Sequence, residues 1–245
     1  DLGIVSLTSL PQAPLPGQAV NIHAIVRNHG PLASETVSLL AREAGHVVWQ
    51  TNLRVLAVKE EVALSFPWTP ATSLTNRASV LAVELSPCSG ELLLADNQRS
   101  VTITNTSETI HDVAIASAKV QAAPLEPGSP APITVEIVNL GNQDEKEITI
   151  QGLQGKQAFA ADRKAALAAG SKLILTYEWA IPAYVPAPDA TAPLYRLTFR
   201  ILPLGTEILV TNNTQILRLG YTRYNGCVIP LHKVEPGKEV HQWIA

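Results

Sequence analysis

Several turn-forming and aromatic residues of this chain recur at a constant spacing of 111 residues. The recurring pairs are Pro16-Gly17 and Pro127-Gly128, Asn28 and Asn139, Gly30 and Gly141, and Trp68 and Trp179. Asp96-Asn97 corresponds to Asn212-Asn213, so the spacing grows to 116 residues and the second copy is longer by five. Such a register predicts that one structural unit is repeated in tandem.

Each copy is built of short segments in which apolar and polar residues alternate. Such a period of two is typical of strands that have one face on a core and the other in water. The inward rows that this pattern predicts include Val62, Leu64, Phe66 and Trp68 in the first copy and Tyr195, Leu197, Phe199 and Ile201 in the second. About seven such strands in about 110 residues indicate an antiparallel β-sandwich. The fold class predicted is therefore all-β, with two tandem sandwiches and an extended C-terminal tail.

The predicted organisation has three parts. The first sandwich occupies residues 1–106, the second occupies residues 110–220, and residues 221–245 form the tail. An Ala-rich stretch, residues 160–169, would favour a helix, but the matching segment of the first copy has the pattern of a strand and a loop.

Composition excludes several classes of protein. The 245 residues carry a net charge of −3, so the chain lacks the basic surplus that a nucleic-acid partner requires. No run of about 18 uncharged apolar residues is present, so no membrane span is predicted. We also find no catalytic motif and no metal or phosphate-binding motif. The sequence therefore predicts no enzyme activity, no cofactor and no metal.

The order of these residues resembles the CARDB family, the cell-adhesion-related domain found in bacteria. The resemblance is carried by Asp-Leu at the start, Pro-Gly, Asn-x-Gly, Trp-x-Pro and a late Asn pair, and it covers roughly 220 of the 245 residues. It implies immunoglobulin-like or fibronectin type III-like sandwiches that serve as non-catalytic repeats in secreted or surface proteins. An extracellular or cell-surface location is expected on this basis.

The tail is open to three interpretations. Pro236-Gly237 resembles the start of a third repeat, so the chain is either cut from a longer repeat protein, or the tail packs on its own domains, or it adds a strand to another subunit. The segment predicted for such subunit coupling includes Cys227, Val228, Ile229 and Leu231. The start at Asp1 fits either a fragment or a processed secreted protein.

The two cysteines have no counterparts across the repeat. A bridge from Cys88 of one chain to Cys227 of the next would link subunits head to tail, and the alternative is two free thiols. The Pro-rich loop of residues 179–194 offers Tyr184 for binding, and Trp49 is a second candidate aromatic residue. Asn105 and Asn212 lie in glycosylation sequons.

The sequence therefore favours a non-catalytic extracellular structural or adhesion protein that acts through protein–protein contacts. Self-assembly into a filament or surface layer is one form of this hypothesis. The alternative is a pair of accessory modules, cut from a larger secreted or cell-surface protein, that bind carbohydrate or protein. The partner expected is a protein or a second copy of the chain, with a polysaccharide as a further possibility.

Overall fold

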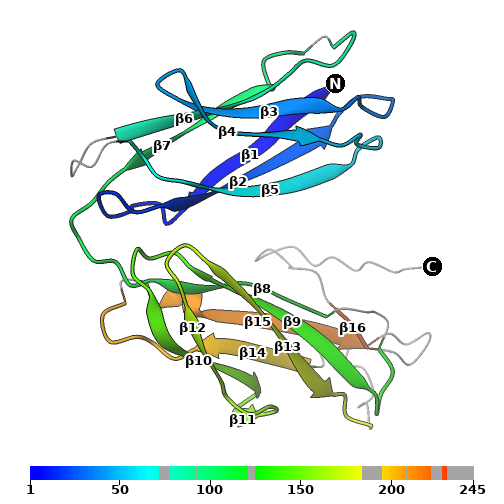
Figure 1. Cartoon of the computed structure of the whole chain (residues 1–245). Helices are drawn as coiled ribbons and strands as arrows, with labels where there is room; N and C mark the ends of the chain where they lie inside the picture. The colour runs from blue at the N-terminus through cyan, green and yellow to red at the C-terminus, as the bar shows by residue number, and fades with distance from the viewer. Residues whose placement is uncertain are drawn as a thin grey trace, which may run out of the picture. The chain divides into compact units, whose positions relative to one another are not determined.

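The repeat units fold into antiparallel β-sandwiches, as the computed structural model of the chain shows (Figure 1). The structure describes residues 1–71, 78–91, 93–120, 125–183, 195–207, 209–221 and 228–230, the last three and residue 221 by their backbone only. Two compact units divide the chain. One holds Asp1–His111, Asn139–Asp144 and Ala168–Ser171, and the other holds Asp112–Val138, Glu145–Leu167 and Lys172–Ala245.

The first sandwich consists of strands β1 to β7. One sheet has the order β1-β2-β5 and the facing sheet has the order β4-β3-β6-β7. The bounds are β1 (Leu2–Leu10), β2 (Val20–Asn28), β3 (Val37–Glu43), β4 (His46–Leu53), β5 (Glu61–Trp68), β6 (Ala78–Leu85) and β7 (Gln98–Thr104). All the strand pairs are antiparallel, so the predicted architecture is confirmed for this unit.

The second sandwich has the same plan. One sheet has the order β13-β9-β8, and the other has the order β11-β10-β14-β15-β16, with β12 paired to β10. The bounds are β8 (Val113–Val120), β9 (Pro130–Asn139), β10 (Glu145–Gln154), β11 (Gln157–Ala158), β12 (Arg163–Leu167), β13 (Lys172–Ala180), β14 (Tyr195–Ile201), β15 (Thr214–Tyr221) and β16 (Val228–Pro230), with a 3-10 turn, η1, at Thr211–Asn213. The described residues contain no α-helix, and the Ala-rich stretch contributes β12.

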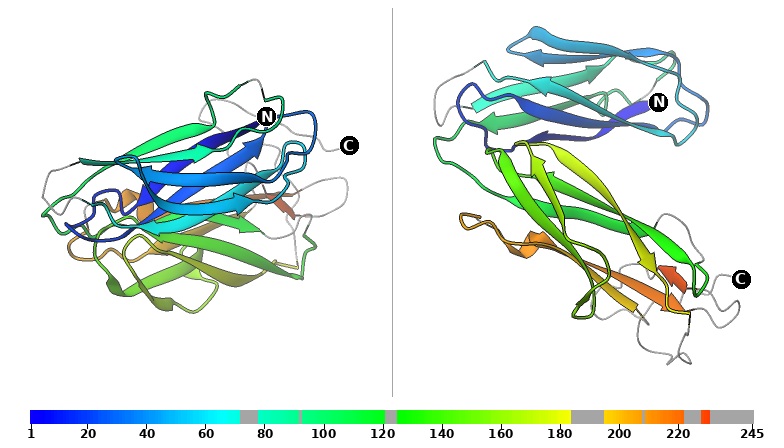
Figure 2. Two further views of the ribbon diagram at one scale, coloured as in Figure 1. Left: turned by 45° about the horizontal axis from the view of Figure 1, so that its top comes forward. Right: turned by 60° about the horizontal axis from the view of Figure 1, so that its bottom comes forward.

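Each core lies between its two sheets, because the strands turn every second side chain inward. On β2, Ile22, Ala24 and Val26 are fully buried, and their neighbours His23 and Ile25 are only half-buried. The views in Figure 2 show each sandwich as two facing layers of strands. The inward rows predicted from the alternation therefore face the cores, which bury Trp68 and Trp179, whereas Val62 and Leu64 are only partly buried against the first core.

The repeat in the sequence is also a repeat of polar contacts. Asn28 Oδ1 accepts the N–H of Gly30 at 2.9 Å, and Asn28 Nδ2 donates to the carbonyl of Leu32. At the spacing of 111 residues, Asn139 makes the same two bonds to Gly141 and Gln143. The indole N–H groups of Trp68 and Trp179 likewise donate to Glu43 and Gln154, at 3.1 and 2.9 Å. Both copies are thus held by the same side-chain hydrogen bonds.

Candidate functional site

Three connections meet at one end of the first sandwich, near the start of β1 (Figure 1). They join β2 to β3, β4 to β5 and β6 to β7. The registers place them together, because Leu2 lies opposite Asn28, Val37 lies opposite Leu53 and Glu84 lies opposite Gln98. We call this surface the loop end; it comprises residues 29–36, 54–60, 86–91 and 93–97.

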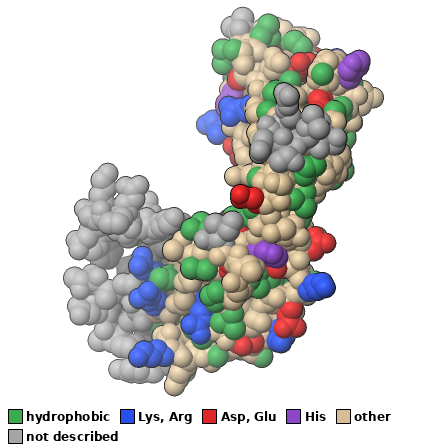
Figure 3. Space-filling model, turned by 90° about the vertical axis from the view of Figure 1, so that its left-hand side faces the viewer, with side chains coloured by type: hydrophobic (Ala, Val, Ile, Leu, Met, Phe, Trp, Pro, Cys, Tyr) green, Lys and Arg blue, Asp and Glu red, His purple; other side chains and the backbone are tan. Residues whose placement is uncertain are grey.

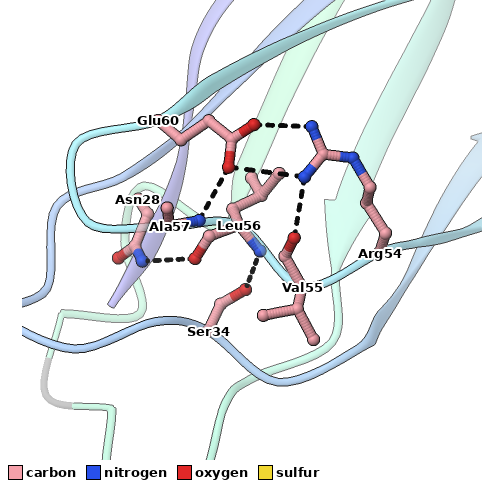
Figure 4. A network of polar contacts seen from close by, with 7 residues as sticks. All are labelled: Asn28, Ser34, Arg54, Val55, Leu56, Ala57 and Glu60. Carbon is pink, nitrogen blue, oxygen red and sulfur yellow. Dashed lines mark hydrogen bonds and ion pairs between the residues drawn. The ribbon is translucent and has the colours of Figure 1, made fainter.

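The first two of these loops are tied together through the backbone of Leu56 (Figure 4). The N–H of Leu56 donates to Ser34 Oγ at 2.9 Å, and its carbonyl accepts Asn28 Nδ2 at 3.0 Å and the N–H of Ser34 at 2.9 Å. The Leu56 side chain is fully buried in the core. These hydrogen bonds satisfy backbone N–H and C=O groups of the loops that do not take part in strand pairing, so the loops have a defined shape.

Arg54 and Glu60 brace the loop between β4 and β5. The Arg54 guanidinium donates to both carboxylate oxygens of Glu60, whose Oε2 also accepts the N–H of Ala57 at 2.7 Å (Figure 4). The hydrogen bond from Arg54 lowers the pKa of the Glu60 carboxyl below its usual value, and the Ala57 N–H adds to this effect. Arg54 is exposed and Glu60 is partly exposed, so the pair contributes to loop geometry rather than to global stability.

Glu91 fastens the third loop to the first strand. Its Oε1 accepts the N–H of Leu2 at 2.7 Å, and its Oε2 accepts the N–H of Cys88 and the Nδ2 of Asn97, both at 2.9 Å. Partial burial raises the pKa of Glu91, but these three hydrogen bonds together outweigh it, and the pKa lies below the usual value. The charged form therefore holds the loop.

These braced loops present large aliphatic side chains to solvent. Leu32 is 76% exposed, and the other four side chains are between 45% and 54% exposed. They are Val55, Val58, Leu93 and Leu94. Single exposed aliphatic residues need no explanation, but a group on adjacent loops is typical of an interaction site. The arrangement can bind an apolar surface, and its loops are already ordered.

The second sandwich keeps the brace but not the apolar group. Glu207 accepts the N–H groups of Val113 and Leu204 and the Nδ2 of Asn213 at 3.0, 3.2 and 2.7 Å, which repeats the bonds of Glu91. Leu209 and Val210 remain about half exposed. The positions equivalent to Leu32, Val55 and Val58 hold Gln143, Ala166 and Ala169. The brace thus belongs to the fold, and the full apolar group belongs to the first sandwich.

Of the two aromatic residues predicted for binding, only Trp49 lies within the described residues. Trp49 lies on the edge strand β4 and is half-buried, and its ring stacks on Phe66 with centroids 4.0 Å apart and planes 6° apart. Its ring thus covers the edge of the core, and its role in binding stays a prediction. Tyr184 lies outside the described residues.

The residues predicted for subunit coupling and glycosylation are also dispersed. Cys88 packs against the first core and forms no disulfide with another described residue, whereas Cys227 and Leu231 lie outside the described residues. Val228 and Ile229 belong to β16, which pairs with β15 of the same chain. Asn105 is 1% exposed, and Asn212 Nδ2 donates to Asp112 at 2.8 Å, so both amides are engaged in the folded chain.

The sequence analysis missed the loop end and the two bracing glutamates. Glu91 and Glu207 each stand six residues before the second residue of the late Asn pair, at the repeat spacing of 116. That shared position was the available signal. No comparable signal marks Leu32, Val55 and Leu93, which are far apart in the sequence.

The described residues place no three His, Cys, Asp or Glu side chains where they would hold a metal ion. Nor does any helix in the described part of the chain have the length and apolar character to cross a membrane.

Comparison with known proteins gives a family match for the first sandwich. Residues 1–86 match the model of the CARDB family. No curated protein sequence matches the chain. Two solved structures, a transglutaminase from red sea bream and the calcium-binding domain CBD12 of CALX1.1, share 10% and 9% identity with it, at TM-scores of 0.31 and 0.27. The alignments cover 94% and 81% of this chain but 31% and 79% of those chains, so this chain spans about a third of the transglutaminase. Residues 1–86, which include β1 to β6 of the first sandwich, are therefore similar to the CARDB family.

Proposed function

We propose that this chain is a non-catalytic, extracellular adhesion protein that binds a protein partner through the loop end of its first sandwich. The family match supports adhesion and a surface location, because CARDB domains are typical of extracellular and surface proteins. The observation that carries the proposal is the group of exposed aliphatic side chains on braced loops.

The chemistry of the loop end favours a protein over a sugar. Its exposed large apolar side chains are aliphatic, and the described residues of these loops include no Phe, Tyr or Trp ring on which a sugar ring would stack. Burial of aliphatic surface contributes about 25 cal/mol for each Å² removed from water. Because the loops are held by Leu56, Glu60 and Glu91, little further ordering opposes this gain.

The test compares two triple variants of the full chain. Beads coated with wild-type protein are scored for adhesion to one another and to the cells that produce the chain. We expect Leu32→Ser/Leu93→Ser/Leu94→Ser to lose most of this adhesion. The matched control is Val47→Ser/Val48→Ser/Val80→Ser, which alters valines on strands that are 44%, 44% and 50% exposed. Equal adhesion by both variants would overturn the proposal.

Assembly into a filament or surface layer would be a more specific form of this function. It requires that β16 leave β15 of its own chain, where Gly220 pairs with Ile229 and Leu219 with Pro230, and join another copy. The mass of the full chain in solution is therefore compared with that of a chain ending at Tyr221. Head-to-tail assembly predicts polymers of the full chain only, and monomers of both would favour accessory modules of a larger protein.

A further inference from the structure

One face of the second sandwich gathers arginines. Leu197 and Phe199 of β14 are buried, so their neighbours Arg196, Thr198 and Arg200 point out of the sandwich. On β15 the outward positions are Thr214, Ile216 and Arg218. Lys and Arg side chains are seen together on one side of the lower sandwich in Figure 3. We call the arginine face the set Arg196, Arg200 and Arg218 with Leu153, Thr198 and Ile216.

Arg196 lies directly opposite Arg218 in the β14–β15 pair. Side chains at such positions start about 5 Å apart at Cβ, and like charges there destabilise a sheet. Both arginines are exposed. In the described part of the chain, no carboxylate forms an ion pair with either of them. Among the described residues, the charge of this pair is thus left without a compensating carboxylate.

The nearby acidic groups are engaged elsewhere. Glu147 pairs with Lys164 at 2.8 Å. Asp162 Oδ2 accepts Gln151 Nε2 at 2.9 Å, and Gln151 Oε1 accepts Arg200 Nε at 2.7 Å. This relay orients Arg200 and leaves its terminal nitrogens without a carboxylate partner among the described residues.

The first sandwich shows that the fold does not require these arginines. At the repeat spacing, Val80 lies opposite Thr102 where the second sandwich has Arg196 opposite Arg218. The position of Arg200 holds Glu84, which forms an ion pair with Arg42 at 3.3 Å. The same strand pair therefore forms with neutral or compensated side chains, so the fold does not require the arginine pair.

We propose that the arginine face binds an acidic polysaccharide. Arg196 and Arg200 are four residues apart on one strand, which separates their positions by about 14 Å. Between the Arg196–Arg218 pair and the single Arg200 lies a row that pairs Leu153 with Thr198 and Thr198 with Ile216. An anionic sugar polymer lying along the strands sets its rings on this less polar row and its carboxylate or sulfate groups on the planar guanidinium forks.

A polysaccharide fits this surface better than an acidic protein does. Arg196 and Arg200 lie on β14, which has β10 on one side and β15 on the other, so a peptide strand cannot add beside it. A linear polymer also carries anionic groups on successive units, so it can place one group on the Arg196–Arg218 pair and another on Arg200 in many equivalent registers. This site is independent of the loop end, so the failure of one proposal leaves the other intact.

The experiment measures retardation of the full chain in gels that contain a polymer. The polymers are polygalacturonate for carboxylates, dextran sulfate for sulfates and dextran as the neutral control. We expect retardation by an anionic polymer that weakens as salt is added. Arg196→Gln/Arg218→Gln is expected to raise the dissociation constant about tenfold or more. The variant Arg196→Lys/Arg218→Lys keeps the charge but loses the planar guanidinium groups. Its dissociation constant should lie between those of the wild type and the Gln variant.

The matched control is Arg99→Gln/Lys119→Gln, which also removes two exposed positive charges, on other sheets, and should leave binding nearly unchanged. If both double Gln variants weakened binding equally, the effect would come from net charge alone, and the proposed site would be overturned. Binding to dextran as strong as that to the anionic polymers, or no retardation by any polymer, would also overturn it. Tighter binding to poly-L-glutamate than to both anionic polysaccharides would replace the polysaccharide with an acidic protein. The Gln variant should unfold at the same temperature as the wild type or higher, which separates lost binding from lost folding.

Discussion

Lys59 and Gly170 occupy equivalent positions of the two sandwiches and have the same left-handed backbone, with φ of 63° and 66°. In both copies the next residue closes the same turn: the N–H of Glu60 donates to Ala57, and that of Ser171 donates to Ala168. The turn is thus a property of the repeat, and glycine is the residue that adopts this φ without steric cost. Lysine, which has a Cβ, is strained there.

We therefore predict that Lys59→Gly stabilises the chain, even though it removes a charged side chain. The release of left-handed strain is expected to raise the free energy of unfolding by about 0.5–1 kcal/mol, after the greater flexibility of the unfolded chain is allowed for. Urea denaturation measures the change. The control is Lys156→Gly, because Lys156 is not among the residues with positive φ. An equal gain from both variants would contradict this explanation.

Glu91→Gln should destabilise the first sandwich. The neutral amide keeps the shape but weakens the bonds from Leu2, Cys88 and Asn97, and we expect a loss of about 1–3 kcal/mol near neutral pH. Glu35→Gln, at an exposed position, is the matched control and should change the free energy of unfolding very little.

The same variant should change how stability depends on pH. The pKa of Glu91 is lowered in the folded chain, so its charge contributes stability above the unfolded pKa, near 4.5, and this contribution is lost as the pH falls through the folded pKa. Urea denaturation at about pH 6 and about pH 3.5 should show a smaller difference for Glu91→Gln than for the wild type. Identical pH dependence of the two proteins would contradict the assigned role of the carboxylate.

Trp49→Ala tests whether this aromatic residue serves the core. The ring lies parallel to that of Phe66 at a centroid distance of 4.0 Å, so its removal uncovers a residue that is only 2% exposed. We expect a loss of about 2–3 kcal/mol, less than for a fully buried tryptophan. Trp49→Phe, which retains a stacking ring, should cost clearly less. A Trp49→Ala variant as stable as the wild type would instead favour a binding role for Trp49.

Grafting the arginine pair into the first sandwich should destabilise it. Val80→Arg/Thr102→Arg places two like charges opposite each other on β6 and β7, and we expect a loss of up to about 1 kcal/mol at low ionic strength. Added salt should reduce the loss, because it screens exposed charges. Val80→Gln/Thr102→Gln is the uncharged control. A loss that does not respond to salt would point to packing rather than charge repulsion.

The sandwich cores could be predicted from the sequence because strand alternation is a local property. On β2 the inward-pointing Ile22 is followed two residues later by a second inward-pointing residue, Ala24. This alternation can be read from the sequence without knowing which strand pairs with β2. The loop end could not be predicted in this way. Leu32, Val55 and Leu93 lie at the same end of the first sandwich only because the β2–β3, β4–β5 and β6–β7 connections lie at one end of two facing sheets.

The repeated markers at a spacing of 111 residues, together with alternating hydrophobicity, determined the tandem all-β architecture, because turn chemistry and strand faces are written in neighbouring residues. The tertiary structure decided which distant side chains meet. It set Arg196 against Arg218, Trp49 against Phe66 and Glu91 against Leu2. Such contacts depend on the register between strands and on the packing of one sheet on another, and these are fixed only when the whole sandwich closes.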